Sequence, residues 1–415
     1  MDGSAAAAYL IVFLTAGLTT VAVTPVVRRL SIRLGAVDHP SDRKVHPQPT
    51  PTMGGIAMFA GFLAALAVTR IMPFFEEMNA GSPEPLAALV TCGLMLFLGV
   101  IDDVRGVSWL AKLTAQIFIG GVLILLGVQL TYFWLPGAGV VFVDPSLSVP
   151  LTILWVAAVS NAVNLVDGLD GLAAGMVGIA AAGFFVYMVR TEAIFGDASA
   201  AALLSLVTVG ICAGFLPWNF HRAKIFMGDS GSMLLGMLLS LATLSGIGRN
   251  YIRPAGGDLA AAIGTVAVPF LILAVPFLDV ILAVVRRTWR RQALGHADKE
   301  HLHHRLMDIG HSHRRAVVLL YLWSLLLTGS GLAAGLLDLR LTVGLVALGL
   351  LTMLLVTASP RLIRRDSSSG PRRGEPDAAV SATASERDGP QGNPPALSVP
   401  YNRGRLKLGG SEAPD

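Results

Sequence analysis

Carboxylate and carboxamide side chains are concentrated at the ends of apolar stretches of this 415-residue chain. Residues 161–171 hold two aspartates and two asparagines, Asp102 and Asp103 end a second apolar run, and Asp229 precedes a third. Ionisable groups at membrane depth are costly and usually functional. Adjacent carboxylates need a shared proton or a cation, and hard oxygen ligands suit Mg²⁺ that carries a substrate phosphate. These residues therefore predict cation-assisted phosphate chemistry, with solvated loop acids as the alternative.

The segment 161–171 offers a second kind of contact. Asn164, Asp167 and Asp170 recur every three residues, which spreads them over one face of a helix, while Gly168 and Gly171 permit close approach of another group. Such a face could bind a metal ion or hydrogen-bond a polar ligand such as a nucleoside. The alternative is a helix start whose free amides are capped by these side chains.

Asp229 lies immediately before an apolar run, in the sequence Phe-Met-Gly-Asp-Ser-Gly-Ser at 226–232. It could cap the following helix and also present an oxygen to Mg²⁺. Glycine-rich backbone at the start of a helix also suits phosphate. Capping alone is the simpler reading, and Phe226 could be an interfacial anchor.

Imidazoles and arginines gather in a loop near residue 300. His301, His303 and His304 lie within four positions, and arginines flank them on both sides. These arginines are Arg286, Arg287, Arg290, Arg291 and Arg305. Such a cationic rim could hold a diphosphate. The alternatives are a zinc site, which the spacing does not favour, and a basic loop that binds lipid headgroups.

The composition requires elements that cross a membrane. Hydrophobic residues make up 53% of the chain and charged residues only 14%, whereas soluble domains average about 25% charged residues. Lysine and arginine lie beside hydrophobic ends, so the net charge of +4 reflects orientation and anionic lipid, and no nucleic-acid partner is expected. Cys92 and Cys212 fall inside apolar runs and form no metal or disulfide pattern.

Apolar runs long enough to span a bilayer predict an all-α, polytopic integral membrane protein with about eleven transmembrane helices. The expected spans are 5–27, 54–72, 85–101, 109–128, 149–163, 169–189, 199–217, 231–248, 259–285, 315–337 and 341–358. No internal repeat stands out.

The connecting segments alternate between basic and nearly uncharged. The basic set includes Arg28, Arg43, Lys44, Arg105, Lys112, Arg222, Lys224 and the arginines near residue 290. Basic loops stay in the cytoplasm, so the N-terminus is expected outside and the C-terminus inside. Every polar cluster then falls on the cytoplasmic side, which predicts one composite site.

The chain changes character after Pro360. Residues 361–415 are rich in small, polar and charged side chains, so we expect a disordered cytoplasmic tail after a catalytic transmembrane domain at 1–360.

Five motifs, taken in order, resemble the polyprenyl-phosphate N-acetylhexosamine-1-phosphate transferase family. They are Pro-Thr-Met-Gly-Gly at 51–55, Asp102-Asp103, the segment 164–171, the segment 226–232 and His-Leu-His-His at 301–304. The resemblance covers most of residues 1–340. His221-Arg222 departs from it, because relatives often have proline there.

The His-Leu-His-His sequence is similar to the branch that transfers GlcNAc-1-phosphate to undecaprenyl or decaprenyl phosphate. The phospho-N-acetylmuramoyl-pentapeptide branch typically has three consecutive histidines. The resemblance therefore implies transfer of GlcNAc-1-phosphate from UDP-GlcNAc to a membrane polyprenyl phosphate. The products are UMP and a polyprenyl-diphosphate-GlcNAc that initiates a cell-envelope glycan.

The resemblance also implies roles for individual residues. Asp229 is the expected Mg²⁺ ligand, with Asp103 and Asn164 near it and Mn²⁺ as the alternative ion. Asp102 orients the acceptor phosphate or takes its proton. The expected contacts to nucleotide, diphosphate or sugar are Lys44, Asp167, Gly168, Leu169, Asp170, Phe226, Arg287, His301, His303 and His304.

The implied location is a bacterial plasma membrane, with the active site facing the cytoplasm. The oligomeric state stays open between a monomer and a homodimer. The alternatives are the muramoyl-pentapeptide enzyme, a UbiA-like prenyltransferase, and a transporter, whose polar residues should line both halves of the membrane.

Overall fold

The computed structural model describes residues 3–39, 48–135, 139–195, 199–248, 302–334 and 337–367, together with Ala274 and Trp289. The expected span at 259–285, apart from Ala274, and the expected disordered tail from residue 368 onward lie outside these residues.

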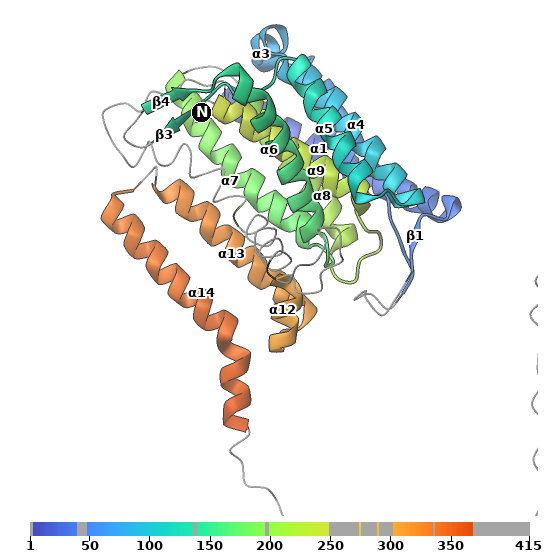
Figure 1. The fold of residues 1–415 in the computed structure, drawn as a ribbon, viewed down its shortest axis with the longest axis vertical. Coiled ribbons are helices and arrows are strands. Elements are labelled where there is room, and N and C mark those ends of the chain that lie inside the picture. The colour runs from blue at the N-terminus through green and yellow to red at the C-terminus, as the bar shows by residue number, and fades with distance from the viewer. Residues whose placement is uncertain are drawn as a thin grey trace, which may run out of the picture. The chain divides into compact units, whose positions relative to one another are not determined.

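Helices dominate the described part of the chain (Figure 1). They are α1 Gly3–Leu34, α2 Gly55–Thr69, the 3-10 turn η1 Pro73–Phe75, α3 Glu76–Gly81, α4 Glu84–Arg105, α5 Trp109–Leu125, α6 Pro145–Val166, α7 Leu172–Phe195, α8 Ala200–Asn219, α9 Gly228–Gly248, α12 Leu302–Ile309, α13 His313–Ala334 and α14 Leu339–Ser367. Two antiparallel hairpins join them, β1 Val37–Asp38 with β2 Thr50–Pro51 and β3 Tyr132–Leu135 with β4 Gly139–Phe142.

Seven helices in the described residues are long and apolar enough to cross a membrane. Helix α2 and the segment Pro73–Gly81 meet at a bend of 94° and form either an eighth, broken span or a re-entrant loop. Ten of the eleven expected spans overlap one of the described helices. The helical, multi-pass class predicted from the composition is therefore confirmed. Helix α14 continues to Ser367, seven residues past the domain boundary expected at 360.

Helix α9 lies in the middle of the bundle and packs against α2, α4, α6, α7 and α8. Its residues from Ser230 to Gly246 are buried. Neighbouring backbones approach its first turn closely, because a Cβ at Gly99 would lie 2.4 Å from Ser230 Cα and one at Gly55 would lie 2.3 Å from the Gly231 nitrogen. Small residues allow such contacts between membrane helices. The packing therefore fixes the first turn of this helix, which contains Asp229, against α2 and α4.

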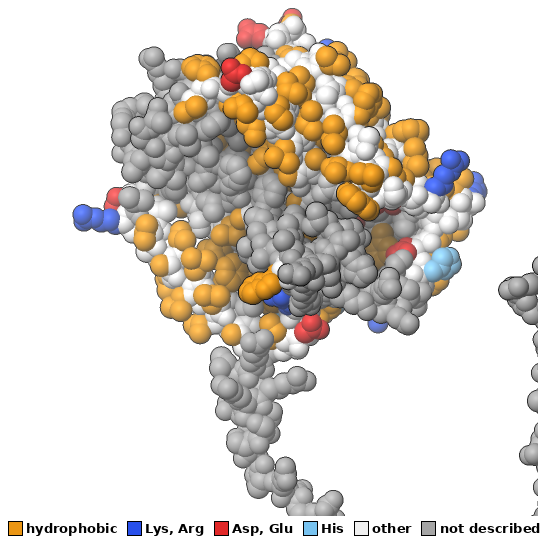
Figure 2. All heavy atoms as spheres, viewed as in Figure 1, with side chains coloured by type: hydrophobic (Ala, Val, Ile, Leu, Met, Phe, Trp, Pro, Cys, Tyr) orange, Lys and Arg blue, Asp and Glu red, His pale blue; other side chains and the backbone are white. Residues whose placement is uncertain are grey.

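The outer surface of the bundle is apolar. Large exposed hydrophobic side chains include Leu14 and Leu18 of α1, Phe118 of α5, and Leu348 and Leu351 of α14. Orange hydrophobic side chains cover much of the described surface in Figure 2. Only 11% of the apolar stretch of α14 is buried within the protein. Surfaces of this extent belong in contact with lipid or another protein.

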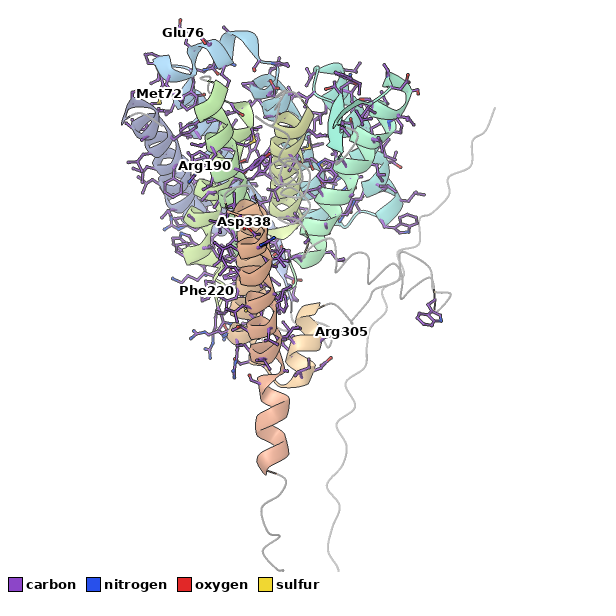
Figure 3. All side chains as sticks on the ribbon, turned by 90° about the vertical axis from the view of Figure 1, so that its left-hand side faces the viewer. Met72, Glu76, Arg190, Phe220, Arg305 and Asp338 are labelled. Atoms are coloured by element: carbon purple, nitrogen blue, oxygen red, sulfur yellow. The ribbon has the colours of Figure 1, made fainter. Side chains whose placement is uncertain are left out.

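The ends of the bundle separate the connecting segments into two groups. Figure 3 shows Met72 and Glu76 at one end, and Phe220 and Arg305 towards the other. The sequence analysis assigned the basic connecting segments, including the one with Arg222 and Lys224, to the cytoplasmic side. The polar clusters described below adjoin the end that holds Phe220.

Candidate active site

Asp103, at the end of α4, caps the first turn of α9. Its two carboxylate oxygens accept hydrogen bonds from the backbone nitrogens of Asp229, at 2.8 Å, and Ser230, at 3.2 Å. Unpaired amides and the helix dipole make a carboxylate favourable at this position. Gly228 has a φ of +69°, and a Cβ there would lie 2.4 Å from Asp103 Oδ2. Asp103 therefore fixes the backbone from which Asp229 projects.

Asp229 lies between an amide and an ammonium group. Asn164 Nδ2, near the end of α6, donates to Asp229 Oδ1 at 2.6 Å and to Ser232 Oγ at 2.8 Å. Lys112 Nζ, in the first turn of α5, donates to Asp229 Oδ2 at 2.6 Å. The Asp229 side chain keeps 31% of its surface exposed, so a ligand can reach it.

Lys112 also forms an ion pair with Asp102 Oδ2. The other oxygen of Asp102 accepts a hydrogen bond from the Val107 nitrogen at 2.7 Å. The lysine and Asp102 side chains are only 15% and 8% exposed. The sequence analysis counted Lys112 only as a loop cation. The available signal was a lysine in the first turn of an otherwise apolar helix, close to the Asp-Asp pair.

Negative charge exceeds positive charge in this cluster. Asp167, directly after α6, has its pKa raised well above the ordinary value by burial and by the charges of Asp229, Asp103 and Asp170. Together with Asp102, the cluster sets several carboxylates against one lysine among the described side chains. Hard oxygen donors and excess negative charge fit Mg²⁺, which proteins hold through one or two carboxylates and substrate phosphates.

The loop from Gly168 to Gly171 is tied to the segment that follows α8. Asn219, buried at the end of α8, accepts from the Gly171 nitrogen at 3.0 Å and donates to the Ile225 carbonyl at 3.1 Å. Asp170 Oδ2 accepts from the Ala223 nitrogen at 3.1 Å. The sequence analysis gave Asn219 no role, although it lies in the motif region before Asp229.

The residues expected to bind nucleotide differ in exposure. Gly168 is exposed, whereas the Leu169 side chain is 4% exposed and packs in the core. Leu169 can therefore meet a ligand only through its backbone. Phe226 is partly buried, and its backbone pairs with the Pro-Thr-Met-Gly-Gly segment, through Pro51 at 2.8 Å and Gly54 at 3.1 Å. Two distant motifs are thus joined by main-chain hydrogen bonds.

Several expected site residues lie outside the described residues. These are Lys44, Arg287 and His301, together with the side chains of His303 and His304 in α12.

A second polar cluster lies beside the nucleotide loop. Single ligand atoms of Asp170, His221 and His313 fall within 4.8 Å of one another. The sequence analysis treated Asp170 as a member of the 161–171 face and an expected substrate contact, and His221 only as a departure from the family pattern. Nothing in the spacing of these three residues indicated that they meet.

The family model for glycosyl transferase family 4 matches residues 85–247, which contain most of the carboxylate cluster. Two mycobacterial proteins named decaprenyl-phosphate N-acetylglucosaminephosphotransferase are similar to this chain. The protein of Mycolicibacterium smegmatis is 40% identical over 86% of this chain and 89% of its own length. The protein of Mycobacterium tuberculosis is 42% identical over 75% of this chain and 79% of its own length.

A Bacillus subtilis protein is similar over nearly the same extent. It is named a probable undecaprenyl-phosphate N-acetylglucosaminyl 1-phosphate transferase and is 35% identical over 75% of this chain and 81% of its own length.

Proposed function

We propose that this chain, which belongs to glycosyl transferase family 4, transfers GlcNAc-1-phosphate from UDP-GlcNAc to a membrane polyprenyl phosphate. The products are polyprenyl-diphosphate-GlcNAc and UMP. The names of relatives that match most of the chain support this reaction. The observation that carries it is the placement of Asp229 between Asn164 and Lys112, beside Asp102, where apolar helices end.

In the proposed reaction, an oxygen of the acceptor phosphate attacks the β-phosphorus of UDP-GlcNAc. The bond from this phosphorus to the bridging oxygen breaks, and UMP leaves with that oxygen. A phosphate monoester has a second pKa of about 6, so at neutral pH it is already largely dianionic. Positioning therefore matters more than proton removal. Asp102, held by Lys112 and the Val107 amide, is placed to orient the acceptor or to accept its remaining proton.

Asp229 is the proposed ligand of Mg²⁺, with Asp103 and Asn164 supporting it and Mn²⁺ as the alternative ion. The ion would neutralise charge on the donor diphosphate and on the departing UMP. Asn164 now directs its amide nitrogen at Asp229, so it orients this carboxylate. A carboxamide turned by 180° would present its oxygen to the cation instead.

Lys112 is proposed to exchange partners during the reaction. Its ammonium is shared by Asp229 and Asp102. A cation held by Asp229 would free the same ammonium to turn to phosphate oxygens. A lysine at this point acts as a mobile positive charge that stabilises the transferring phosphoryl group.

The remaining proposed contacts are to nucleotide, diphosphate and sugar. Gly168 and the backbone of Leu169 would face the uridine together with Asp167 and Asp170, and Phe226 would stack on the base. Lys44, Arg287, His301, His303 and His304 would contact the diphosphate or the sugar.

The proposed setting is a bacterial plasma membrane crossed eleven times, with the N-terminus outside and the site open to the cytoplasm. Basic loops on the side of the polar clusters support this orientation. The relatives named above are bacterial.

A donor panel tests the proposal. Purified full-length protein is incubated with Mg²⁺, decaprenyl or undecaprenyl phosphate, and either UDP-GlcNAc or UDP-N-acetylmuramoyl-pentapeptide. We expect equimolar UMP and lipid-linked GlcNAc from the first donor and no lipid product from the second. Lipid product from the pentapeptide donor alone would assign the chain to the muramoyl branch. No product from any UDP-N-acetylhexosamine would refute the proposed reaction.

A further inference from the structure

We propose that Asp170, His221 and His313 together bind one divalent transition-metal ion of the zinc type. The ion would join the loop after α6, the segment after α8 and the first residue of α13. This site is separate from the proposed Mg²⁺ ligand Asp229 but shares Asp170 with the proposed uridine contacts. The inference does not rest on the proposed transfer reaction.

The spacing of the three side chains fits a small tetrahedral ion. Zinc binds nitrogen and oxygen at about 2.0–2.2 Å, which places neighbouring ligand atoms about 3.4 Å apart. The distance from His221 Nδ1 to Asp170 Oδ2 is 3.4 Å. The rings of His221 and His313 lie 4.8 Å apart, tilted by 32°. Because all three ligand atoms lie within 4.8 Å, modest ring rotations would bring the third ligand into place.

The imidazole nitrogens lack other partners. His221 Nδ1 and His313 Nε2 are both buried and accept or donate no hydrogen bond among the described residues. Buried polar atoms are normally paired, so two unpaired nitrogens in one cluster need an explanation. A shared cation would satisfy both lone pairs and would also neutralise Asp170.

Hydrogen bonds around the cluster hold the ligands in place. Asp170 Oδ2 accepts from the Ala223 nitrogen at 3.1 Å, and Arg314 Nη2 donates to the His221 carbonyl at 3.3 Å. Tyr321 of α13 donates to the carbonyl of Gly171, the residue after Asp170, at 2.5 Å. Outer partners of this kind orient metal ligands and raise affinity.

The ligand types select the ion. Two imidazoles and one carboxylate suit Zn²⁺, Co²⁺ or a similar ion, whereas Mg²⁺ prefers oxygen alone. Three protein ligands would leave a fourth position for water. The competing arrangement is an ion pair between protonated His221 and Asp170, with no metal.

Cobalt provides a direct probe. Metal-stripped, full-length protein in detergent is titrated with Co²⁺ in excess Mg²⁺, which competes for sites made of oxygen ligands alone. We expect one Co²⁺ per chain with the intense visible absorption of four-coordinate cobalt, loss of that absorption on adding Zn²⁺, and a higher melting temperature with either ion.

Variants locate the ion. Because loss of an outer partner already costs about 10- to 100-fold in metal affinity, His221→Gln or His313→Gln should weaken Co²⁺ binding at least about 100-fold. The matched control is His311→Gln, two residues away, since His311 Nε2 already contacts the Thr357 carbonyl at 2.9 Å. His311→Gln and Asp229→Asn should keep the absorption. Wild-type protein with no stoichiometric cobalt signal, or a signal that survives both histidine substitutions, would overturn the site.

Discussion

The carboxylate cluster at the start of α9 and the histidine cluster beside Asp170 differ in how they balance charge. The first places Asp102, Asp103 and Asp229 around Lys112 and a helix N-terminus, so internal positive groups partly neutralise it. The second has one carboxylate and two imidazoles, each with a buried ring nitrogen that forms no hydrogen bond within the described part of the chain. The first suits a hard ion that shares its charge with phosphate, and the second suits an ion that binds nitrogen. Ligand chemistry can therefore separate two sites that adjoin the same loop.

The largest expected effect is at the carboxylate cluster. Asp229→Asn keeps the size of the side chain but removes the charge proposed to hold the cation. Groups that stabilise a transferring phosphoryl contribute on the order of 10³ to 10⁵ in rate, so UMP release from UDP-GlcNAc should fall by at least about 1,000-fold. Asp338→Asn, an exposed change just before α14, is the matched control and should keep normal turnover. Near-normal turnover by Asp229→Asn would remove the metal assignment.

Lys112→Ala should separate cation binding from catalysis. Turnover should fall by about 10² to 10³, as for loss of one electrostatic group that stabilises a transition state. Mg²⁺ should bind the variant more tightly, because the ammonium no longer competes for Asp229. Melting temperature against Mg²⁺ concentration measures this binding. Lys224→Ala removes an exposed lysine that lies 5.3 Å from the Trp218 ring and should change neither quantity. Weaker Mg²⁺ binding by Lys112→Ala would contradict the exchange of partners.

Asp167→Asn should stabilise the ion-free protein. The pKa of this carboxyl is raised by burial and by neighbouring carboxylates. The carboxyl of Asp167 therefore keeps its proton to a higher pH in the folded state than in the unfolded state, where its pKa is about 3.9. The protein loses folding stability as the pH rises from this value through the raised pKa of the folded state. The gain in melting temperature from Asp167→Asn should therefore be larger at pH 8 than at pH 5.

Asp144→Asn is the control for Asp167→Asn, because the pKa of Asp144 is shifted in the opposite direction. Hydrogen bonds from the Ser146 side chain and backbone lower the pKa of Asp144, so its charged form stabilises the fold at neutral pH. Its replacement should give no gain at pH 8. Equal gains from both variants would show that burial and local charge at Asp167 are not responsible.

The smallest expected effect is at the scaffold of the histidine cluster. Tyr321→Phe removes the hydrogen bond to the Gly171 carbonyl but keeps the ring that packs against Gly175. Loss of one hydrogen bond typically costs about 0.5–1.5 kcal/mol, so a small drop in melting temperature is expected. Co²⁺ binding should weaken less than in His221→Gln. If Tyr321→Phe weakened Co²⁺ binding as much as His221→Gln, the ion would not be held by the proposed ligands.

Local sequence features determined the class of this protein and the motifs of its site. Hydrophobic content and run length are summed over neighbouring residues, so they predicted the multi-pass helical class without any knowledge of packing. The Asp-Asp pair, the 164–171 segment and the segment around Asp229 were likewise recognisable, because each motif is contiguous.

The tertiary structure alone decided which side chains meet. Asp103 accepts a hydrogen bond from the backbone of Asp229, 126 positions later, and Lys112 reaches Asp229 across 117 positions. His221 and His313 come together from two segments that lie far apart in the sequence. The segment that holds His221 also departs from the family pattern. Such pairs depend on how small residues such as Gly55 and Gly99 let helices approach, and this information is not contained in the spacing of the charged residues themselves. Composition and motifs therefore showed which functional groups the chain contains. Packing decided that these groups form a carboxylate cluster and a histidine cluster.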